Sequence, residues 1–277
     1  MITEKAYAKI NLGLYVGPVR HDGYHEVKTI MVPIDIYDEL SFTEIESGIV
    51  LIDNTSYLVE DNLAYKAAKL FINKYKIEQG VRIVLKKKIP SEAGLGGGSS
   101  DAAAVLRGLN RLFGVGANDQ ELATLASELG SDVPYMVYSK LCKCEGRGEI
   151  ATLLPDKYPN YKICIIKPPY GLSTKKVYDE YVFERGQTHN QDFEDLYNSF
   201  INEDIAGIGE NLFNDLEKPA CVLCPQLKEL IDKIKEMGFI CGMCGSGTAI
   251  FAMCEKGKFE KIFQTIKYHQ IYDTKIL

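Results

Sequence analysis

Apolar and polar residues alternate near the start of the chain, and this period of two predicts a β-strand over residues 4–16. One face of that strand carries the aliphatic positions Ile10, Leu12, Leu14 and Val16. Lys9 and Asn11 fall on the opposite face, because successive side chains of a strand point in opposite directions. Taken alone, the pattern leaves Lys9 open to the ordinary interpretation of a solvent-exposed strand lysine.

The two-residue period of strands and the helical period of about 3.6 residues divide the rest of the chain into further elements. Alternation and short apolar runs predict strands at 27–42, 81–85, 163–166 and 248–254. Helical spacing predicts helices at 63–75, 102–113, 118–129, 174–181, 225–237 and 259–266. Tyr158-Pro159-Asn160 interrupts this series and reads as a linker. The pattern therefore predicts an α+β protein of two lobes, residues 1–155 and residues 156–277.

A glycine-rich stretch at residues 90–104 departs from this pattern. It reads Pro-Ser-Glu-Ala-Gly-Leu-Gly-Gly-Gly-Ser-Ser-Asp-Ala-Ala-Ala. Its glycines leave the backbone free to adopt positive φ and to approach a ligand closely. Ser99 or Ser100 is predicted to be the N-cap of the helix that follows, and Gly114 is predicted to close that helix.

A glycine loop that runs into a helix N-terminus is typical of an anion site, most often for phosphate. Backbone N–H groups and the positive end of the helix dipole converge there. The loop is not a Gly-x-x-x-x-Gly-Lys-Ser/Thr motif, and it lacks the third glycine of the dinucleotide fingerprint. Lys86, Lys87 and Lys88 precede it, where they would suit a polyphosphate or form a solvated strand end. The alternative for the loop itself is a glycine-rich hairpin before an ordinary helix.

Two further polar segments are candidates for binding or chemistry. Tyr24 and His25 follow the turn dipeptide Asp22-Gly23, and an aromatic ring beside an imidazole can stack on a base and hydrogen-bond its edge. A loop aromatic beside a surface histidine is the simpler interpretation. Asp132 follows a predicted helix end, where the negative pole of the dipole disfavours a carboxylate, unless Ser131 or Asp132 caps the next helical turn.

Composition and charge restrict the class of protein. The chain has 277 residues, enough to bury a sizeable core, and its net charge of −6 argues against a general basic surface for nucleic acid. Its first residues contain no apolar run typical of a signal peptide, and no segment approaches the length of a membrane span. We therefore expect a cytoplasmic protein with neither a membrane nor a nucleic acid as partner.

The eight cysteines are expected to be free thiols in a chain of this length that lacks a secretion signal. The pairs Cys221/Cys224 and Cys241/Cys244 also match the spacing of a four-cysteine zinc site. Against zinc, the first pair is predicted to open a helix and the second to lie on a strand, and only the second precedes a turn. We assign no metal ligands, and a zinc-binding interaction module stays open as an alternative.

Five segments, in this order, resemble the GHMP small-molecule kinases and span residues 8–247. They are Ala8-Lys9-Ile10-Asn11-Leu12, Asp22-Gly23-Tyr24-His25, Pro90 through Ala104, Gly130-Ser131-Asp132-Val133-Pro134 and Gly245-Ser246-Gly247. The glycine loop marks the superfamily. The first two segments, together with Asn214-Asp215-Leu216-Glu217, are similar to the branch whose acceptor is a cytidine diphosphate carrying a branched tetritol.

The resemblance implies a fold, a reaction and cofactors. The fold is two-lobed α+β, with a left-handed βαβ unit in the N-terminal lobe and a ferredoxin-like C-terminal lobe. ATP would bind with its phosphates over residues 90–100, with Mg²⁺ as cofactor. The reaction would phosphorylate the tertiary hydroxyl of the tetritol.

The resemblance also implies roles for individual residues. The catalytic lysine and aspartate of the family fall on Lys9 and Asp132. The residues implied to bind the acceptor are Asn11, Tyr24, His25 and Tyr178. The residues implied to bind ATP are Asn62, Lys87, Pro90, Ser91, Glu92, Ala93, Gly94, Leu95, Gly96, Gly97, Gly98, Ser99 and Ser100. Relatives vary at residues 91–93, and the cysteine pairs have no counterpart in the family.

Two alternatives remain within this resemblance. A related kinase could act on mevalonate, homoserine or a sugar, but those acceptors have no base for Tyr24 and His25 to contact. A non-catalytic sensor could bind a nucleotide without transferring phosphate, but such a protein would be expected to have lost Lys9 or Asp132.

Overall fold

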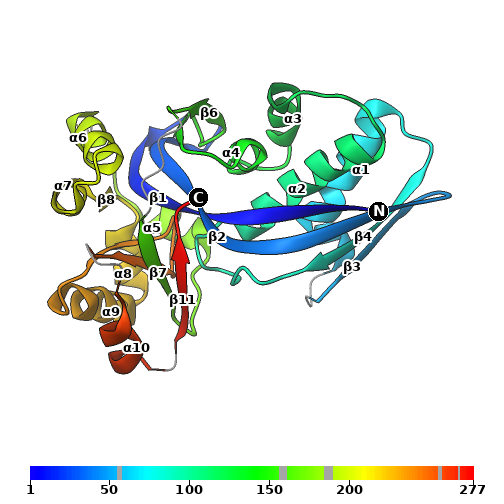
Figure 1. The fold of residues 1–277 in the computed structure, drawn as a ribbon. Helices are drawn as coiled ribbons and strands as arrows, with labels where there is room; N and C mark the ends of the chain where they lie inside the picture. Colours follow the sequence, from blue (N-terminus) through cyan, green and yellow to red (C-terminus); the bar gives the residue numbers. More distant parts are fainter. Residues whose placement is uncertain (55–57, 156–160, 184–189, 255–257, 268) are drawn as a thin grey trace.

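The computed structural model describes residues 1–54, 58–155, 161–183, 190–254, 258–267 and 269–277 (Figure 1). The strands are β1 (Ile2–Val19), β2 (His25–Ile45), β3 (Ile49–Asp53), β4 (Gly80–Lys86), β5 (Cys142–Glu145), β6 (Ile150–Leu153), β7 (Lys162–Lys167), β8 (Phe213–Asn214), β9 (Ile240–Met243), β10 (Ile250–Met253) and β11 (Gln270–Lys275). The helices are η1 (Val59–Asp61), α1 (Leu63–Tyr75), α2 (Gly97–Leu112), α3 (Asp119–Ala126), α4 (Val133–Tyr138), α5 (Thr174–Glu180), α6 (Asn190–Ile201), α7 (Ile205–Asn211), α8 (Glu217–Leu223), α9 (Pro225–Glu236) and α10 (Glu260–Thr265).

Two sheets organise the molecule. The larger has the order β3-β4-β2-β1-β8, with β5 and β6 added through β2, and the smaller has the order β11-β7-β10-β9. The parallel neighbours β3 and β4 are joined through α1, which makes a βαβ unit. Strands β1–β6 build the larger sheet and β7 and β9–β11 the smaller. β8 lies late in the chain but pairs with β1, so the C-terminal half contributes an edge strand to the larger sheet.

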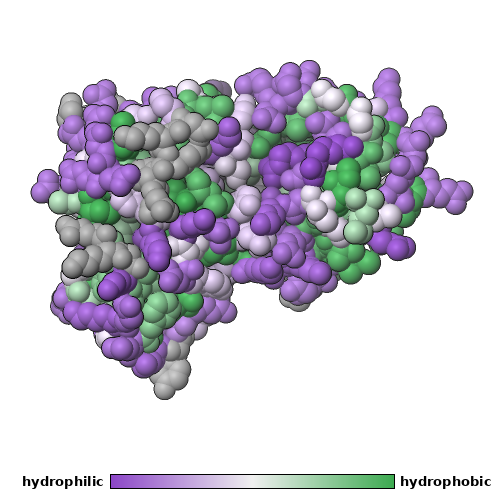
Figure 2. Space-filling view, in the orientation of Figure 1, coloured by the Kyte–Doolittle hydropathy of each residue, from purple (hydrophilic) through white to green (hydrophobic). Residues whose placement is uncertain are grey.

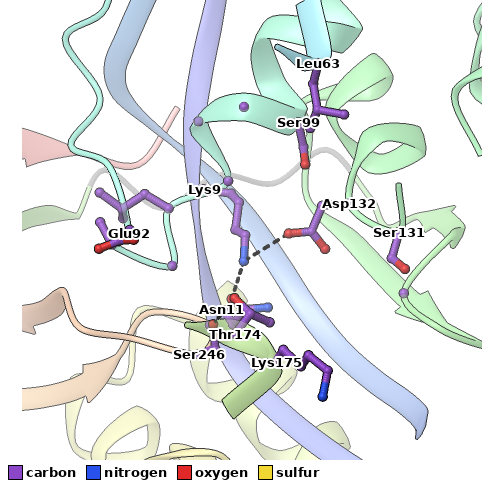
Figure 3. A pocket seen from close by; sticks show the side chains of 18 of the residues that line it. Lys9, Asn11, Leu63, Glu92, Ser99, Ser131, Asp132, Thr174, Lys175 and Ser246 are labelled. Carbon is purple, nitrogen blue, oxygen red and sulfur yellow. Dashed lines mark hydrogen bonds and ion pairs between the residues drawn. The ribbon is translucent and has the colours of Figure 1, made fainter. Parts of the chain in front are cut away.

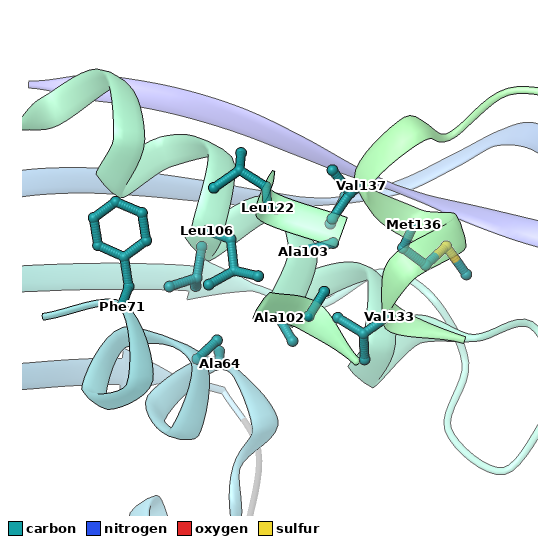
Figure 4. Packing of buried hydrophobic residues seen from close by; sticks show 14 of the residues in the cluster. Ala64, Phe71, Ala102, Ala103, Leu106, Leu122, Val133, Met136 and Val137 are labelled. Atoms are coloured by element: carbon teal, nitrogen blue, oxygen red, sulfur yellow. The ribbon is translucent and has the colours of Figure 1, made fainter. Parts of the chain in front are cut away.

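Helices α1–α4 cover one face of the larger sheet and enclose the first part of the core. Small and large side chains are combined in this cluster, among them Ala64 and Phe71 of α1 and Ala103 and Leu106 of α2 (Figure 4). Alanines at the start of α2 let the helices approach closely, and α1 and α2 are in extensive contact. This packing fixes the N-terminal end of α2 relative to β1.

β1 lies at the centre of the molecule, and its two faces have different environments. Ile10 and Leu12 are fully buried in a second cluster that also contains Ile165 of β7 and Phe251 of β10. The aliphatic face of β1 therefore packs against the smaller sheet. On the face shown in Figure 2, hydrophilic side chains cover much of the surface, with apolar ones between them.

Lys9 lies on the other face of β1 and is not solvent-exposed, since only 3% of its surface is accessible. Asn11 is equally buried on the same face, as the alternation predicts. The interpretation of Lys9 as an ordinary exposed strand lysine is therefore wrong. A buried ammonium needs partners, and they lie in the site described below.

The prediction that Ser99 or Ser100 caps α2 is also wrong. The N-cap is Gly96, in the left-handed region at φ 71°, with no side-chain capping bond. Because glycine adopts this conformation easily, the chain turns into the helix three or four residues earlier than the serines suggest. Gly114, at φ 61°, follows the C-cap Phe113, so its predicted place at the helix end is confirmed.

Other predicted elements match the structure more closely. α1 has the expected bounds with Asn62 as its N-cap, and Asn118 and Glu121 form the expected capping box of α3. Patterns did not predict β3, α4, β5, β6, α7, α8, β8 or β11, which are short or half-exposed, and they did not predict α6 in the polar stretch at residues 186–210. The proposed linker at residues 158–160 lies outside the described residues.

Candidate active site

A cavity of about 1000 Å³ lies between the glycine loop, β1, the residues before α4, and the turn that follows β9 (Figure 3). Its lining comes from segments throughout the chain. The sequence-predicted residues that line it are Lys9, Asn11, Tyr24, His25, Asn62, Lys87, Pro90, Ser91, Glu92, Ala93, Gly94, Leu95, Gly96, Gly97, Gly98, Ser99, Asp132 and Tyr178. The fold therefore brings the implied catalytic, acceptor-binding and nucleotide-binding residues to one place.

Ser100 is not among the lining residues, although it was predicted to bind ATP. Its side chain is buried and donates a hydrogen bond to the backbone carbonyl of Tyr7 at 2.7 Å. Its backbone N–H donates to the carbonyl of Gly96 at 2.9 Å. Because α2 begins at Gly97, Ser100 already lies inside the helix and fastens it to β1.

Glycine is sterically required at two positions of the loop. Gly94 and Gly96 have φ of 72° and 71°, in the left-handed region. A Cβ at Gly94 would lie 1.8 Å from the carbonyl oxygen of Cys244, and one at Gly96 would lie 2.3 Å from Cε of Met136. The loop is therefore packed tightly between the two halves of the molecule, and its backbone rather than its side chains faces the cavity.

Backbone hydrogen bonds fix this loop from both sides. The N–H of Lys9 donates to the carbonyl of Leu95 at 3.1 Å. From the other half, the N–H groups of Thr248 and Ala249 donate to the carbonyls of Glu92 and Ala93 at 3.3 and 3.2 Å. The sixteen-residue helix α2 then begins at the cavity wall. Its first N–H groups lack intrahelical partners, so this wall favours an anion such as phosphate.

Lys9 and Asp132 form an ion pair in the cavity. Lys9 Nζ lies 3.5 Å from Oδ2 of Asp132 and donates to Oδ1 of Asn11 at 2.7 Å (Figure 3). The Lys9 side chain is 4% exposed, whereas that of Asp132 is 32% exposed. The ammonium is therefore fixed and the carboxylate is accessible to a molecule in the cavity.

The local fold explains why Asp132 tolerates its position. It is the residue that precedes α4, and its side chain makes no capping bond to that helix. The carboxylate thus lies at the start of a short helix, where the dipole favours negative charge, and not only after the end of α3. The expectation that it caps the next turn is met by position but not by a side-chain hydrogen bond.

Lys87 lies in a buried group of charges beneath the start of α2. Its Nζ donates to Oδ2 of Asp101 at 2.6 Å and also to Oδ2 of Asp38. Asp38 is fully buried and also accepts the backbone N–H of Ile89 at 2.8 Å. Burial raises the pKa of Asp101 to about 8, against the opposite effect of the nearby ammonium. The ion pair between Lys87 and Asp101 therefore connects the residues before the glycine loop with those after it.

Aromatic side chains gather at another part of the cavity. The His25 ring lies 5.6 Å from the ring of Tyr178 and 5.7 Å from that of Tyr181, measured between centroids. His25 Nδ1 lies 2.9 Å from the carbonyl oxygen of Gly17. Tyr24 is 54% exposed, and the guanidinium of Arg147 lies 5.0 Å from its ring centroid. An exposed ring beside an oriented imidazole can receive a flat heterocycle.

Several lining residues were not identified from the sequence as site residues. Thr174 and Ser246 hydrogen-bond through their hydroxyl oxygens at 2.8 Å, which joins α5 to the turn after β9. Asn214 donates to the carbonyls of Met243 and Gly245 and so orients that turn. Ser246 and Asn214 lie in segments that carry the family resemblance, so the resemblance could have identified them as site residues. Arg147 lies between two glycines, and nothing in the sequence identified it as a site residue.

Within the described part of the chain, no cluster of three or more His, Cys, Asp or Glu side chains is placed to bind a metal ion. The cysteines are free thiols, and most are buried. The prediction for the two cysteine pairs is met only in part: Cys224 is the N-cap of α9 but Cys221 lies on the preceding helix α8, and Cys241 lies on β9 but Cys244 follows it. Likewise, no helix that the structure describes is long and apolar enough to cross a membrane.

Comparison with known proteins identifies the family. Residues 62–140 match the GHMP kinases N terminal domain, and residues 194–270 match the GHMP kinases C terminal domain. The chain is 41% identical to the 4-diphosphocytidyl-2-C-methyl-D-erythritol kinase of Clostridium beijerinckii over 252 residues, which are 90% of this chain and 89% of the relative. The chain belongs to this family of GHMP kinases.

Further relatives of this GHMP kinase agree. The 4-diphosphocytidyl-2-C-methyl-D-erythritol kinase of Enterococcus faecalis is 37% identical, covering 96% of this chain and 95% of the relative. A crystal structure of 4-(cytidine 5'-diphospho)-2C-methyl-D-erythritol kinase superposes with a TM-score of 0.82 at 31% identity over 99% of each chain. Homoserine kinase from Cytophaga hutchinsonii, at 20% identity and a TM-score of 0.79, shares the fold. The predicted two-lobed GHMP kinase fold is confirmed.

Proposed function

We propose that this kinase transfers the γ-phosphoryl group of ATP to the 2-hydroxyl of 4-diphosphocytidyl-2-C-methyl-D-erythritol, in the non-mevalonate pathway of isoprenoid biosynthesis. Family membership supports the reaction, since relatives over nearly the full length bear this name. The single structural observation that carries the proposal is the Lys9–Asp132 pair, 3.5 Å apart, in the same cavity as the glycine loop.

In this reaction Asp132 accepts the proton of the acceptor hydroxyl. Its carboxylate is accessible and bears no capping bond, so one oxygen is available for that proton. Lys9 keeps the carboxylate in place and stabilises the negative charge that develops on the transferred phosphoryl group. Phosphoryl transfer depends on such positioning and charge stabilisation more than on covalent chemistry by the protein.

The nucleotide phosphates bind along the glycine loop and at the N-terminus of α2. Steric crowding behind Gly94 and Gly96 keeps the backbone against the cavity, where N–H groups are the donors. Mg²⁺, bound together with ATP, would lower the negative charge of the phosphate oxygens. The hydroxyl of Ser99, which lines the cavity, is a hard oxygen ligand of the type that Mg²⁺ accepts. Asn62 and Lys87 border the nucleotide.

The cytosine of the acceptor binds among Tyr24, His25 and Tyr178. Burial raises the pKa of the Tyr178 phenol, so this ring stays neutral beside His25. Neutral aromatic faces favour stacking, and the imidazole provides a hydrogen-bonding edge. An acceptor without a base, such as homoserine or mevalonate, leaves this part of the cavity without a function.

The setting of the enzyme belongs to the same proposal. Eight free cysteines suit the reducing cytoplasm, and a net charge of −6 disfavours nucleic acid as a partner. The partners are then ATP and the cytidylated tetritol.

The direct test measures ADP release by the purified enzyme with ATP, Mg²⁺ and the cytidylated tetritol, with homoserine and mevalonate as control acceptors. We expect turnover with the first acceptor alone and a new phosphate monoester on its tertiary carbon by ³¹P NMR. Faster turnover with homoserine or mevalonate would refute the assignment of the acceptor.

A further inference from the structure

A buried chain of hydrogen bonds continues behind Lys9. Lys9 Nζ donates to Asn11 Oδ1 at 2.7 Å, and Asn11 Nδ2 donates to the hydroxyl oxygen of Thr29 at 2.9 Å. That hydroxyl donates to the carbonyl oxygen of Gly13 at 2.6 Å. Thr29 is fully buried and Lys9 and Asn11 are each 3% exposed, so the Thr29 hydroxyl finds its partners within the protein. Neither the sequence pattern nor the family resemblance pointed to Thr29.

The polarity of this chain is fixed at its far end. The carbonyl of Gly13 can only accept a hydrogen bond, so the Thr29 hydroxyl must direct its proton there. Its oxygen then presents a lone pair to Asn11, and the amide must turn its NH₂ group toward Thr29. Oδ1 is consequently the atom that faces the ammonium of Lys9. The opposite orientation of the Asn11 amide would place its NH₂ group against the Lys9 ammonium, donor against donor, and its oxygen against the lone pair of Thr29.

We propose that Thr29 is a positioning residue for phosphoryl transfer, which acts on Lys9 through the amide of Asn11. The inference rests on the proposed role of Lys9. The ammonium donates one N–H to Asn11 and is ion-paired with Asp132 at 3.5 Å, which leaves an N–H for the phosphoryl group in transit. A turned amide would remove the acceptor and let the ammonium rotate away from this arrangement.

The position of Thr29 in the sheet makes a clean test feasible. Thr29 lies inside β2, where it pairs with Leu14 of β1 and with Cys144 of β5, so a β-branched replacement retains the strand. Thr29→Val has nearly the same shape but no hydroxyl. Thr29→Ser retains the hydroxyl and lacks the methyl group. The two variants therefore separate the hydrogen bond from packing.

We expect Thr29→Val to lower kcat roughly 10- to 100-fold, by analogy with the loss caused when residues that orient metal ligands are removed. The KM for ATP and for the acceptor should change less than about twofold, because Thr29 does not line the cavity. Thr29→Ser should retain most of kcat. Equal kcat values for the two variants, or a loss confined to KM, would overturn the proposal.

A double-mutant comparison tests whether the effect passes through Lys9. In a Lys9→Met background, measured through its residual turnover, Thr29→Val should cause no further loss. A loss that multiplies with that of Lys9→Met would show that Thr29 acts by another route. If Thr29→Val does not fold, as judged by its thermal unfolding, Thr29→Ala replaces it as the variant without a hydroxyl.

A measurement without substrate separates this inference from the proposed function. In crystal structures of the unliganded enzyme, Thr29→Val should lengthen the contact between Lys9 and Asp132, whereas Thr29→Ser should retain it. An unchanged contact in the valine variant would overturn the positioning role even if the acceptor is correct. Conversely, a lengthened contact in an enzyme that fails to phosphorylate the cytidylated tetritol would leave the positioning intact and refute the acceptor.

Discussion

Lys9 carries a charge that the fold has removed almost entirely from solvent, at 3% exposure. Burying an ammonium is costly unless it is paired and hydrogen-bonded, and here Asn11 and Asp132 supply the partners. Asp132 is the more exposed member of the pair, so it is the one that a bound acceptor can reach. We therefore propose separate functions for the two residues, although they are in contact.

Replacing Asp132 with Asn tests the base without a change in side-chain size. A positioned general base contributes about 10²- to 10⁴-fold to a rate, so kcat should fall within that range. The affinity for ATP, measured by direct binding, should change little, because the glycine loop lies on another wall. Full turnover by Asp132→Asn would mean that another group accepts the proton.

Tyr24 is exposed at the opposite part of the cavity and can be removed without disturbing the core. Stacking on a base contributes about 1–3 kcal/mol, so Tyr24→Ala should raise the acceptor KM roughly 5- to 150-fold with little effect on the KM for ATP. Tyr24→Phe is the matched control, since it retains the ring and should retain the affinity. An unchanged acceptor KM in Tyr24→Ala would place the cytosine elsewhere.

At the scale of elements, most of the longer helices and strands followed from local pattern, whereas the helix α6 and the junctions between elements did not. α1 and its cap at Asn62 are visible in the sequence because spacing and capping act within a few residues. The start of α2 was misplaced, because Gly96 in the left-handed region outweighs the capping preference of Ser99 and Ser100. β8 has two residues and exists only through its pairing with β1, which no local window contains.

The glycine loop offers a test of how a junction contributes to both stability and binding. Gly94→Ala introduces left-handed strain of about 1–2 kcal/mol and also places a Cβ 1.8 Å from the carbonyl oxygen of Cys244. We expect a lower thermal unfolding temperature and a raised KM for ATP, because the loop must shift to relieve the contact.

Gly114→Ala is the matched control for Gly94→Ala. Gly114 also has a positive φ, of 61°, but its substituent would meet nothing within 4 Å. It should therefore show the strain alone, a fall in unfolding temperature of about 2–8 °C for 1–2 kcal/mol in a protein of this size, with an unchanged KM for ATP. Equal effects of the two substitutions on ATP binding would contradict the importance of the close contact at Gly94.

At the scale of the whole molecule, the site exists because both halves contribute to it. Lys9 comes from β1, Asp132 precedes α4, and Ser246 follows β9. Periodicity could place each of these residues on an element, but only the family resemblance predicted that they converge. Convergence depends on the second core cluster, in which β1 packs against the smaller sheet, and contacts over such sequence distances leave no local pattern.

The burial of the cysteine thiols predicts slow chemical modification, and the same experiment tests for zinc. Burial raises the pKa of Cys142, Cys164, Cys241 and Cys244 to about 12, and the reactive thiolate is therefore nearly absent at pH 8. In the native enzyme these four should react with iodoacetamide far more slowly than after unfolding in guanidinium chloride. Mass spectrometry of the peptides identifies each site.

A zinc site at the cysteine pairs would give a different result. Zinc would protect Cys221 and Cys224 together with Cys241 and Cys244, and a chelator would then expose all four and lower the unfolding temperature. If the cysteines are free, protection should follow burial alone: Cys221 is partly exposed and should react sooner than Cys241, which is 5% exposed. A chelator should change neither the order of labelling nor the unfolding temperature. Among the described residues no such group of side chains is placed to bind a metal ion. Chelator-dependent labelling of both pairs would contradict this arrangement and establish a zinc site.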